Sequence, residues 1–170
     1  HVDEPAQKIG AVNTVVNRDG RLYGYNTDYY GMKALFDHAG IDPEGRKAAI
    51  LGSGATSRTA KALLTSLGAR EINVISRSHG ITYDELYAKH SATEIIVNTT
   101  PVGMYPNNLQ SPLSLAGFTH LSGVLDIVYN PQKTKLILDA EKRGIPAFSG
   151  LTMLVAQAKA MILCHEMCDA

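Results

Sequence analysis

The sequence lacks an excess of charge of either sign. Its 170 residues include 16 Lys and Arg against 16 Asp and Glu, which gives a formal net charge of zero, and like charges form no block along the chain. Nothing in this distribution indicates a charged face for nucleic acid or for a membrane surface. We therefore expect neither as a partner.

Long apolar runs are missing as well. No stretch approaches the roughly 20 apolar residues that a membrane-spanning helix requires. Residues 1–5 show neither the basic start nor the apolar core of a signal peptide. The length suits one domain with a sizeable core and is too short for two large ones.

Cysteine is scarce, with only Cys164 and Cys168, one helical turn apart near the end of the sequence. So few cysteines favour reduced thiols, and hence the cytoplasm, over a disulfide framework. His165 and Glu166 between them raise the alternative of a metal site. Structural zinc usually takes four ligands, however, and nothing nearby in the sequence supplies the rest, so we expect no metal.

Strand-like and helix-like segments alternate along the sequence. This alternation predicts an α/β fold, Rossmann-like and doubly wound, with a mainly parallel sheet and flanking helices. Little room remains before the strand at 94–98, so the third strand of the first half is expected to be missing or shortened. Strands are expected at 11–16, 21–25, 48–51, 71–75, 94–98, 123–129 and 146–148, and helices at 26–40, from the glycine loop to Gly68, and at 82–89, 132–143 and 152–167.

A glycine-rich loop joins the strand at 48–51 to the next helix. Two glycines allow a tight turn and close approach of the backbone to a ligand. The following helix directs its unpaired N–H groups and positive dipole end to the same point, which suits a pyrophosphate. The sixth position of the loop is Ser57 rather than glycine, so the strand and helix on either side carry the prediction. The residues expected to bind the pyrophosphate are Gly52, Ser53, Gly54, Ala55 and Thr56.

The next predicted strand, at 71–75, ends in Ser76, Arg77 and Ser78. An acidic residue that would bind an unmodified ribose 2′-hydroxyl is absent there, and an arginine stands in its place. Arginine suits a 2′-phosphate. The pattern therefore predicts NADP as the cofactor, with Ser76, Arg77 and Ser78 around the phosphate.

Several segments, taken in order, resemble shikimate dehydrogenases over nearly the whole chain. They are Ile9-Gly10-Ala11-Val12-Asn13-Thr14, Gly24-Tyr25-Asn26-Thr27-Asp28, the glycine loop, Ser76-Arg77, Asn98-Thr99-Thr100-Pro101-Val102-Gly103-Met104, Asp126-Ile127-Val128-Tyr129-Asn130-Pro131 and Gly150-Leu151-Thr152-Met153-Leu154-Val155-Ala156-Gln157. The resemblance implies NADP-dependent reduction of 3-dehydroshikimate to shikimate, in aromatic amino acid biosynthesis. It also implies one NADP-binding domain over residues 1–170, in which 1–40 and 150–170 form the inter-domain hairpin and helices.

The resemblance also assigns roles that local chemistry does not. By itself, Asn26-Thr27-Asp28 is typical of a helix cap. In the family, the aspartate matching Asp28 faces the substrate and acts with a lysine, so Asp28 is the expected catalytic residue. The further residues implied are Asn13, Asp28, Tyr129 and Gln157 at the substrate, Thr100, Val102 and Met104 along the cofactor, and Ile127 and Gly150 beside the nicotinamide.

Two features depart from the family pattern. The N-terminal substrate domain, with its Ser-x-Ser pair and its lysine in Asn-x-Thr-x-Pro-x-Lys, has no counterpart in this sequence, and the usual Gly-Ala-Gly-Gly is here Gly52-Ser53-Gly54-Ala55. We expect the chain to bind NADP but to be nearly inactive without that covalently attached domain; a homodimer is compatible with the resemblance. Two alternatives stay open: a quinate-using relative and a stand-alone NADP-binding sensor module.

Overall fold

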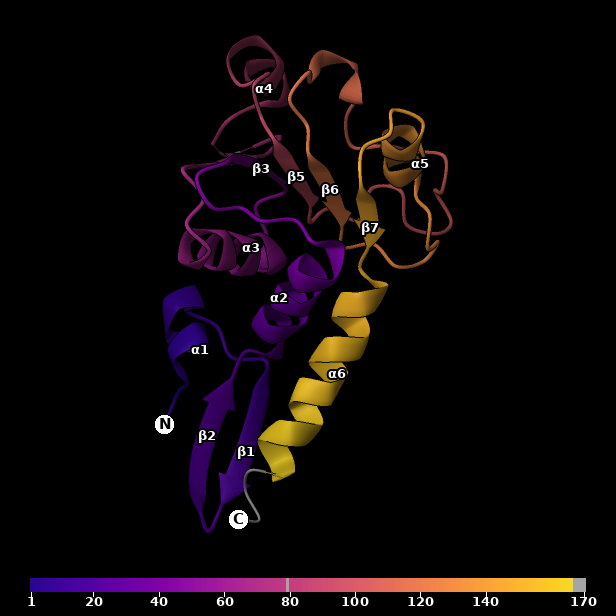
Figure 1. The fold of residues 1–170 in the computed structure, drawn as a ribbon. Helices are drawn as coiled ribbons and strands as arrows, with labels where there is room; N and C mark the ends of the chain where they lie inside the picture. The colour runs from indigo at the N-terminus through magenta and orange to yellow at the C-terminus, as the bar shows by residue number, and fades with distance from the viewer. Residues whose placement is uncertain (79, 167–170) are drawn as a thin grey trace.

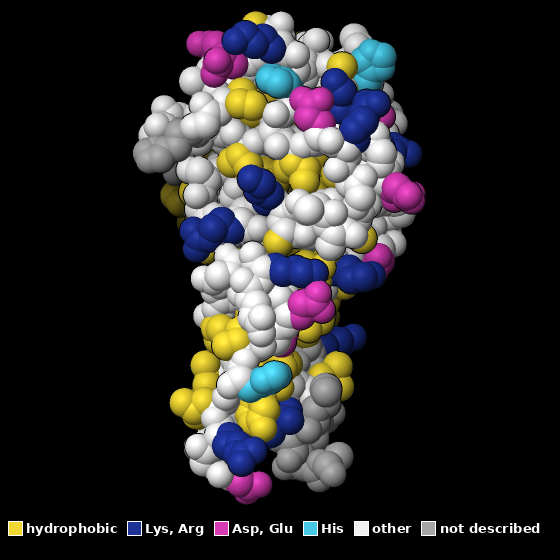
Figure 2. Space-filling model, turned by 90° about the vertical axis from the view of Figure 1, so that its left-hand side faces the viewer, with side chains coloured by type: hydrophobic (Ala, Val, Ile, Leu, Met, Phe, Trp, Pro, Cys, Tyr) yellow, Lys and Arg dark blue, Asp and Glu magenta, His cyan; other side chains and the backbone are white. Residues whose placement is uncertain are grey.

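The computed structural model describes residues 1–78 and 80–166. The molecule has two parts of different width (Figures 1 and 2). A broad body surrounds a parallel sheet, and a narrower arm extends from it and carries the N-terminus. Within the described ranges, no helix is long and apolar enough to cross a membrane.

A five-stranded parallel sheet organises the body. Its order is β4-β3-β5-β6-β7, so the chain runs outward from β3 to β4 and then crosses back to the other side of β3. Between β4 and β5 the described residues contribute no further strand to this sheet. The doubly wound α/β fold and its missing third strand are both confirmed. The strands are β3 (Lys47–Leu51), β4 (Glu71–Ile75), β5 (Ile95–Asn98), β6 (Gly123–Asp126) and β7 (Ala147–Ser149).

The central strands are apolar because helices cover both faces of the sheet. In β3, Ala48 and Ile50 point into one apolar cluster, while Ala49 and Leu51 point into the other. All four side chains are fully buried. The crossover helices are α3 (Ala55–Ser66), α4 (Tyr83–Lys89) and α5 (Lys135–Glu141), with a short 3-10 turn at Leu115–Gly117.

The arm consists of a hairpin and three helices. Its two long helices lie against one another: a Cβ on Gly31 would stand 2.7 Å from the backbone oxygen of Met153, so only glycine allows this approach. The elements are α1 (Glu4–Ile9), β1 (Thr14–Arg18), β2 (Arg21–Tyr25), α2 (Thr27–Ala39) and α6 (Leu151–Glu166).

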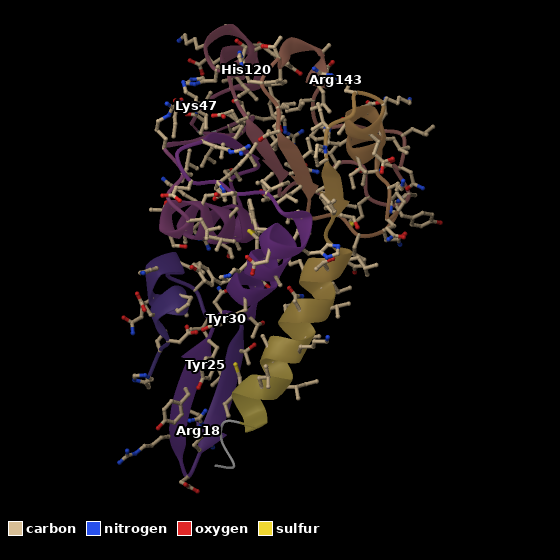
Figure 3. The ribbon with its side chains drawn as sticks, in the orientation of Figure 1. Arg18, Tyr25, Tyr30, Lys47, His120 and Arg143 are labelled. Atoms are coloured by element: carbon tan, nitrogen blue, oxygen red, sulfur yellow. The ribbon has the colours of Figure 1, made fainter. Side chains whose placement is uncertain are left out.

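Polar side chains tie the arm together (Figure 3). The Arg18 guanidinium donates to the Tyr25 hydroxyl at 3.1 Å, across the hairpin. The Tyr30 hydroxyl, on α2, donates to the Asp3 carboxylate at 3.0 Å. Asp3 also caps α1, a six-residue helix that the sequence did not predict. The Asp3 N–H donates to the Gly24 oxygen of β2 at 2.9 Å, so Asp3 connects the N-terminal residues both to the hairpin and to α2.

Most predicted elements are confirmed, with shifted ends. The first strand begins at Thr14 rather than Ala11, and the expected strand at 123–129 ends at Asp126. The helix expected at 132–143 covers only 135–141, because Thr134 caps its start. The final helix is described to Glu166, so its expected end at Met167 lies outside the described residues.

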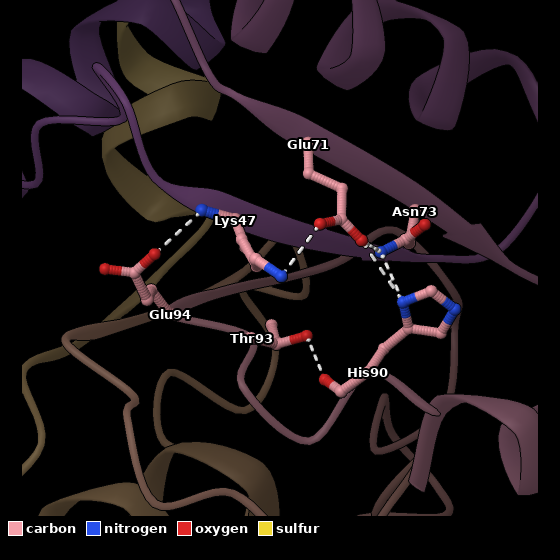
Figure 4. Close-up of polar contacts among 6 residues, drawn as sticks. All are labelled: Lys47, Glu71, Asn73, His90, Thr93 and Glu94. Carbon is pink, nitrogen blue, oxygen red and sulfur yellow. Dashed lines mark hydrogen bonds and ion pairs between the residues drawn. The ribbon is translucent and has the colours of Figure 1, made fainter. Parts of the chain in front are cut away.

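A polar cluster surrounds Glu71 at the first residue of β4 (Figure 4). Its carboxylate accepts a hydrogen bond from the Asn73 amide at 2.8 Å and pairs with the Lys47 ammonium at 3.0 Å. The His90 ring nitrogen Nδ1 lies 3.2 Å from the same carboxylate. The Asn73 hydrogen bond, followed by that of Lys47, lowers the pKa of Glu71 to about 2.

We predict that Glu71→Gln lowers the midpoint temperature of unfolding at neutral pH. A depressed folded-state pKa stabilises the fold above the unfolded value of 4.5, and this contribution disappears as the pH falls toward about 2. The gap between wild type and variant, measured by calorimetry, should therefore close with acidification. Glu44→Gln, at an exposed site, is the control; a gap independent of pH would contradict the prediction.

Candidate functional site

The candidate site lies at the carboxyl edge of the sheet. The chain leaves β3 and β5 in opposite directions there, which creates the type of crevice in which open α/β sheets bind ligands. The segments after β3, β4, β5, β6 and β7 all reach this edge, and α6 descends from it beside α2 (Figure 1). The predicted cofactor residues come from these segments.

The glycine loop makes a tight turn and leaves the start of α3 open. Gly52 has φ of +108°, and a Cβ there would lie 2.9 Å from the Thr99 hydroxyl oxygen. Gly54 is the N-cap of α3 and makes no side-chain cap within the described structure. A Cβ on Gly54 would meet no atom within 4 Å. The first N–H groups of α3, at residues 55–57, therefore remain available for an anion.

The segment after β4 lies against this loop. The Ser53 and Ser76 hydroxyls are 3.2 Å apart, and the Ser78 N–H donates to the Ser76 hydroxyl at 3.3 Å. Arg77 is exposed. Burial raises the pKa of Tyr83, and the positive charge of Arg77 opposes that rise. The three predicted phosphate residues thus occupy one turn beside the glycine loop.

The loop after β5 is held by Asn98, the last residue of that strand. The Asn98 amide oxygen accepts from the Thr100 N–H at 3.0 Å and from the Thr100 hydroxyl at 2.7 Å. The Thr100 hydroxyl accepts in turn from the Val102 N–H at 3.3 Å. Met104, two residues further, is 45% exposed at the surface of the site. These bonds give the loop a fixed shape.

A fully buried carboxylate lies below this loop. Asp126 is paired with Asn98 in the register of β5 and β6, and the Asn98 amide donates to it at 2.9 Å. The Thr134 hydroxyl donates to its other oxygen at 2.6 Å. Burial raises the pKa of Asp126 to about 6, against the opposing effect of its three hydrogen bonds.

Ile127 and Gly150, both predicted to lie beside the nicotinamide, are in contact with each other. A Cβ on Gly150 would overlap the backbone oxygen of Ile127, so only glycine fits. The Gly150 N–H donates to the Val128 oxygen at 3.2 Å. The residue that begins the descent to α6 is thereby fixed against the end of β6.

The arm joins two of the predicted substrate residues. Asn13 precedes β1, and its amide oxygen accepts from the Thr27 N–H at 2.8 Å and from the Thr27 hydroxyl at 3.2 Å. Asp28 follows in the first turn of α2 and hydrogen bonds to the Asn13 side chain. Burial raises the pKa of Asp28, and the Asn13 hydrogen bond partly offsets the rise. The cap itself is Asn26, whose side chain accepts from the Tyr29 N–H.

Gln157 and Tyr129 are placed less tightly. The Gln157 Cβ faces Gly31, one helical turn along α2 from Asp28; a Cβ on Gly31 would stand 2.9 Å from it. Tyr129 is 49% exposed after β6 and makes no hydrogen bond within the described residues. The structure brings Asn13 and Asp28 into contact, places Gln157 near them, and leaves Tyr129 on the sheet edge.

Sequence reasoning missed the part played by Asn98, Asp126 and Thr134. The available signal was an acidic residue at the end of an otherwise apolar strand, with an asparagine at the end of the preceding one. The expected absence of a metal site concerns Cys168, which lies outside the described residues. In the described part of the chain, no three His, Cys, Asp or Glu side chains are grouped to hold a metal.

The doubly wound sheet, the glycine turn at the start of α3 and the polar carboxyl edge together define a Rossmann-like fold of the NADP-binding type. No family model matches the chain. It is 37% identical to the NADP-dependent shikimate dehydrogenase of Clostridium perfringens strain SM101, over 92% of this chain and 62% of that protein. The chain thus spans about 62% of the length of such a curated relative.

Solved structures agree with this comparison. Shikimate dehydrogenase 1 of Peptoclostridium difficile is 38% identical, with a TM-score of 0.83, over 99% of this chain and 64% of that one. The Thermus thermophilus enzyme, in complex with NADP(H) and shikimate, is 30% identical with a TM-score of 0.81, over 95% of this chain and 64% of that one. The chain is a homologue of the shikimate dehydrogenases over nearly its whole length, and the predicted resemblance is confirmed.

We predict that Gly150→Ala destabilises the fold by about 3 kcal/mol, because the new methyl group would overlap backbone that cannot move independently. Chemical denaturation gives the free energy of unfolding. Gly54→Ala is the matched control: its methyl group has open space and a negative φ, so its cost should stay below about 1 kcal/mol. Equal stability of the two variants would contradict the assigned contact.

Proposed function

We propose that residues 1–170 form the NADP-binding domain of a shikimate dehydrogenase, with 1–40 and 150–170 as the hairpin and helices between domains. The whole enzyme would reduce 3-dehydroshikimate to shikimate in aromatic amino acid biosynthesis, in the cytoplasm. The observation that carries the proposal is the uncapped start of α3, next to the Ser76–Ser78 turn. It lies at the same edge of the sheet from which α6 runs beside α2, the helix whose first turn contains Asp28.

The cofactor would extend along this edge of the sheet. Residues 52–56 would hold the pyrophosphate, since Gly52 admits close approach and α3 offers N–H groups and a positive dipole end. Arg77 would bind the 2′-phosphate with Ser76 and Ser78, and no carboxylate in that turn would repel it. These features favour NADP over NAD.

The nicotinamide half would lie along Thr100, Val102 and Met104 and against Ile127 and Gly150. The absence of a side chain at Gly150 lets a flat ring approach the backbone. The bound cofactor supplies the hydride. The residues of this chain would orient the nicotinamide ring. Asn98 fixes the loop after β5, and the contact with Ile127 fixes Gly150.

Asp28 would handle the proton at the substrate oxygen. The raised pKa of Asp28 helps its carboxyl group to hold a proton. Asn13 would orient this carboxyl group, because the Asn13 side chain is itself held by the Thr27 N–H. Asn13, Gln157 and Tyr129 would bind polar groups of the substrate. The lysine that the family pairs with this aspartate belongs to a segment that these 170 residues do not contain, so the chain alone should turn over very slowly.

The surface of the arm supports a partner domain. Val12, Val15 and Leu22 are 42%, 58% and 60% exposed, and Val15 shares one face of the hairpin with Leu22. Figure 2 shows hydrophobic side chains at the surface of the arm. We assign this face to the N-terminal substrate domain, because more than a third of each of these relatives lies outside the segment that matches this chain. A homodimer through the same face is the alternative occupant.

Cofactor choice is tested by titrating the chain with NADP and NAD. Wild type should prefer NADP, and Arg77→Ala should weaken NADP binding about 10- to 100-fold while changing NAD binding little, because a charge-assisted contact contributes about 1.5–3 kcal/mol. Arg70→Ala is the control, since Arg70 is also exposed but precedes β4. Equal affinity of wild type for both cofactors would refute the 2′-phosphate site.

Activity is tested with a chimaera that places the N-terminal domain of the Clostridium perfringens enzyme before this chain. The chimaera should oxidise shikimate with NADP, the 170-residue chain alone should show little turnover, and Asp28→Asn should lower kcat in the chimaera at least about 100-fold. Leu22→Glu should weaken docking of the added domain and lower the midpoint temperature of the chimaera. Robust turnover by the chain alone would overturn the two-domain site, and self-association abolished by Leu22→Glu would favour the homodimer.

A further inference from the structure

Three hydrogen-bond donors converge on the Asp126 carboxylate. Replacing any of these donors by an acceptor would remove its hydrogen bond to the carboxylate. One oxygen accepts from the Asn98 amide at 2.9 Å and from the Val128 N–H at 3.1 Å. The other accepts from the Thr134 hydroxyl at 2.6 Å. The carboxylate is fully buried, so water does not compete for these positions.

The donors beyond Asn98 form a chain that runs in one direction. The Val102 N–H donates to the Thr100 hydroxyl, which donates to the Asn98 amide oxygen, and the Asn98 amide group donates to Asp126. The orientation of the Asn98 amide is therefore determined by partners on both sides. An acceptor-only group at the end fixes the direction of every bond in the chain.

This network joins three segments that are far apart in the sequence. Asn98 ends β5 and holds the loop that follows, Val128 belongs to the loop after β6, and Thr134 caps α5 through the Ile137 N–H at 3.4 Å. The two loops also meet where the Tyr105 N–H donates to the Asn130 oxygen at 3.0 Å. Asp126 is the point at which all three segments are bound to one group.

We propose that Asp126 is a positioning residue that holds the loops after β5 and β6 in the single arrangement to which the nicotinamide half of NADP(H) binds. It touches neither cofactor nor substrate and acts through Asn98, Thr100 and Val128. This inference rests on the proposed function. It divides the site in two, because among the described residues no hydrogen bond joins 52–56 or 76–78 to Asp126, and these residues would bind the adenosine half.

The test compares two ligands that differ in the nicotinamide half. NADPH spans the whole site, whereas adenosine 2′,5′-bisphosphate reaches only the adenosine half. Asp126→Asn replaces one accepting oxygen by an NH₂ group, which then faces a donor of the network instead of accepting from it. The substitution therefore disrupts the network without adding bulk. We expect NADPH affinity to fall at least about tenfold and adenosine 2′,5′-bisphosphate affinity to stay within about twofold. Calorimetric titration at pH 8 keeps Asp126 ionised, since its pKa is about 6.

Thr134 provides an independent variant if Asp126→Asn does not fold. Thr134→Val removes one donor and should reproduce the selective loss, while Thr134→Ser keeps the hydroxyl and should restore NADPH binding. Thr93→Val is the matched control, because Thr93 is also buried but donates to the His90 oxygen at the opposite end of β5. It should leave both affinities unchanged.

The outcomes separate this inference from the proposed function. If wild type binds neither ligand, the NADP site itself is wrong. If wild type binds both, and Asp126→Asn and Thr134→Val weaken both ligands equally or neither, the positioning role is refuted. A loss confined to NADPH, together with the loss of its fluorescence change on binding, establishes it.

Discussion

Burial of both faces of the sheet is the constraint on which the rest of the structure depends. The side chains of β3, β5 and β6 are in contact with helices or loops above and below, so polar chemistry along their length would be costly. Polar groups can gather only where the strands end. The carboxyl edge therefore carries the glycine turn, the Ser76–Ser78 turn and the Asn98–Asp126 pair. The candidate site therefore lies at the carboxyl edge because the rest of each central strand is buried in the apolar core.

Local patterns predicted the body of the fold well. Each strand of the sheet is a short apolar run between turn residues, and the glycine loop lies between a strand and a helix that both form as expected. The short distance between α4 and β5 indicated that a third strand would be missing or shortened, and the described residues between β4 and β5 add no strand to the sheet. The ends of the elements were less predictable. Thr134 and Asp3 determine where two helices start through side-chain hydrogen bonds, and the hydrophobic periodicity of the sequence does not reveal these bonds.

Non-local contacts explain what the sequence could not predict. Asp28 lies in the first turn of a helix, where an acidic residue is ordinary, and only its contact with Asn13 distinguishes it. Asn98 and Asp126 stand 28 positions apart and meet because β5 and β6 pair in one register. The family resemblance implied roles for both Asn13 and Asp28. It did not indicate the contact between Asn98 and Asp126, because a sequence motif does not state which of its residues touch.

The contact between Gly150 and Ile127 also has a mechanical consequence. Gly150 directly precedes α6, whose 16 residues make a rod of roughly 24 Å at about 1.5 Å per residue. The rod lies along α2 and reaches the hairpin. A tilt of about 5° at the pivot would move the far end by roughly 2 Å, given that length. The fixed contact between Gly150 and Ile127 therefore sets the angle at which α6 leaves the sheet, and with it the place where the far end of α6 meets the hairpin.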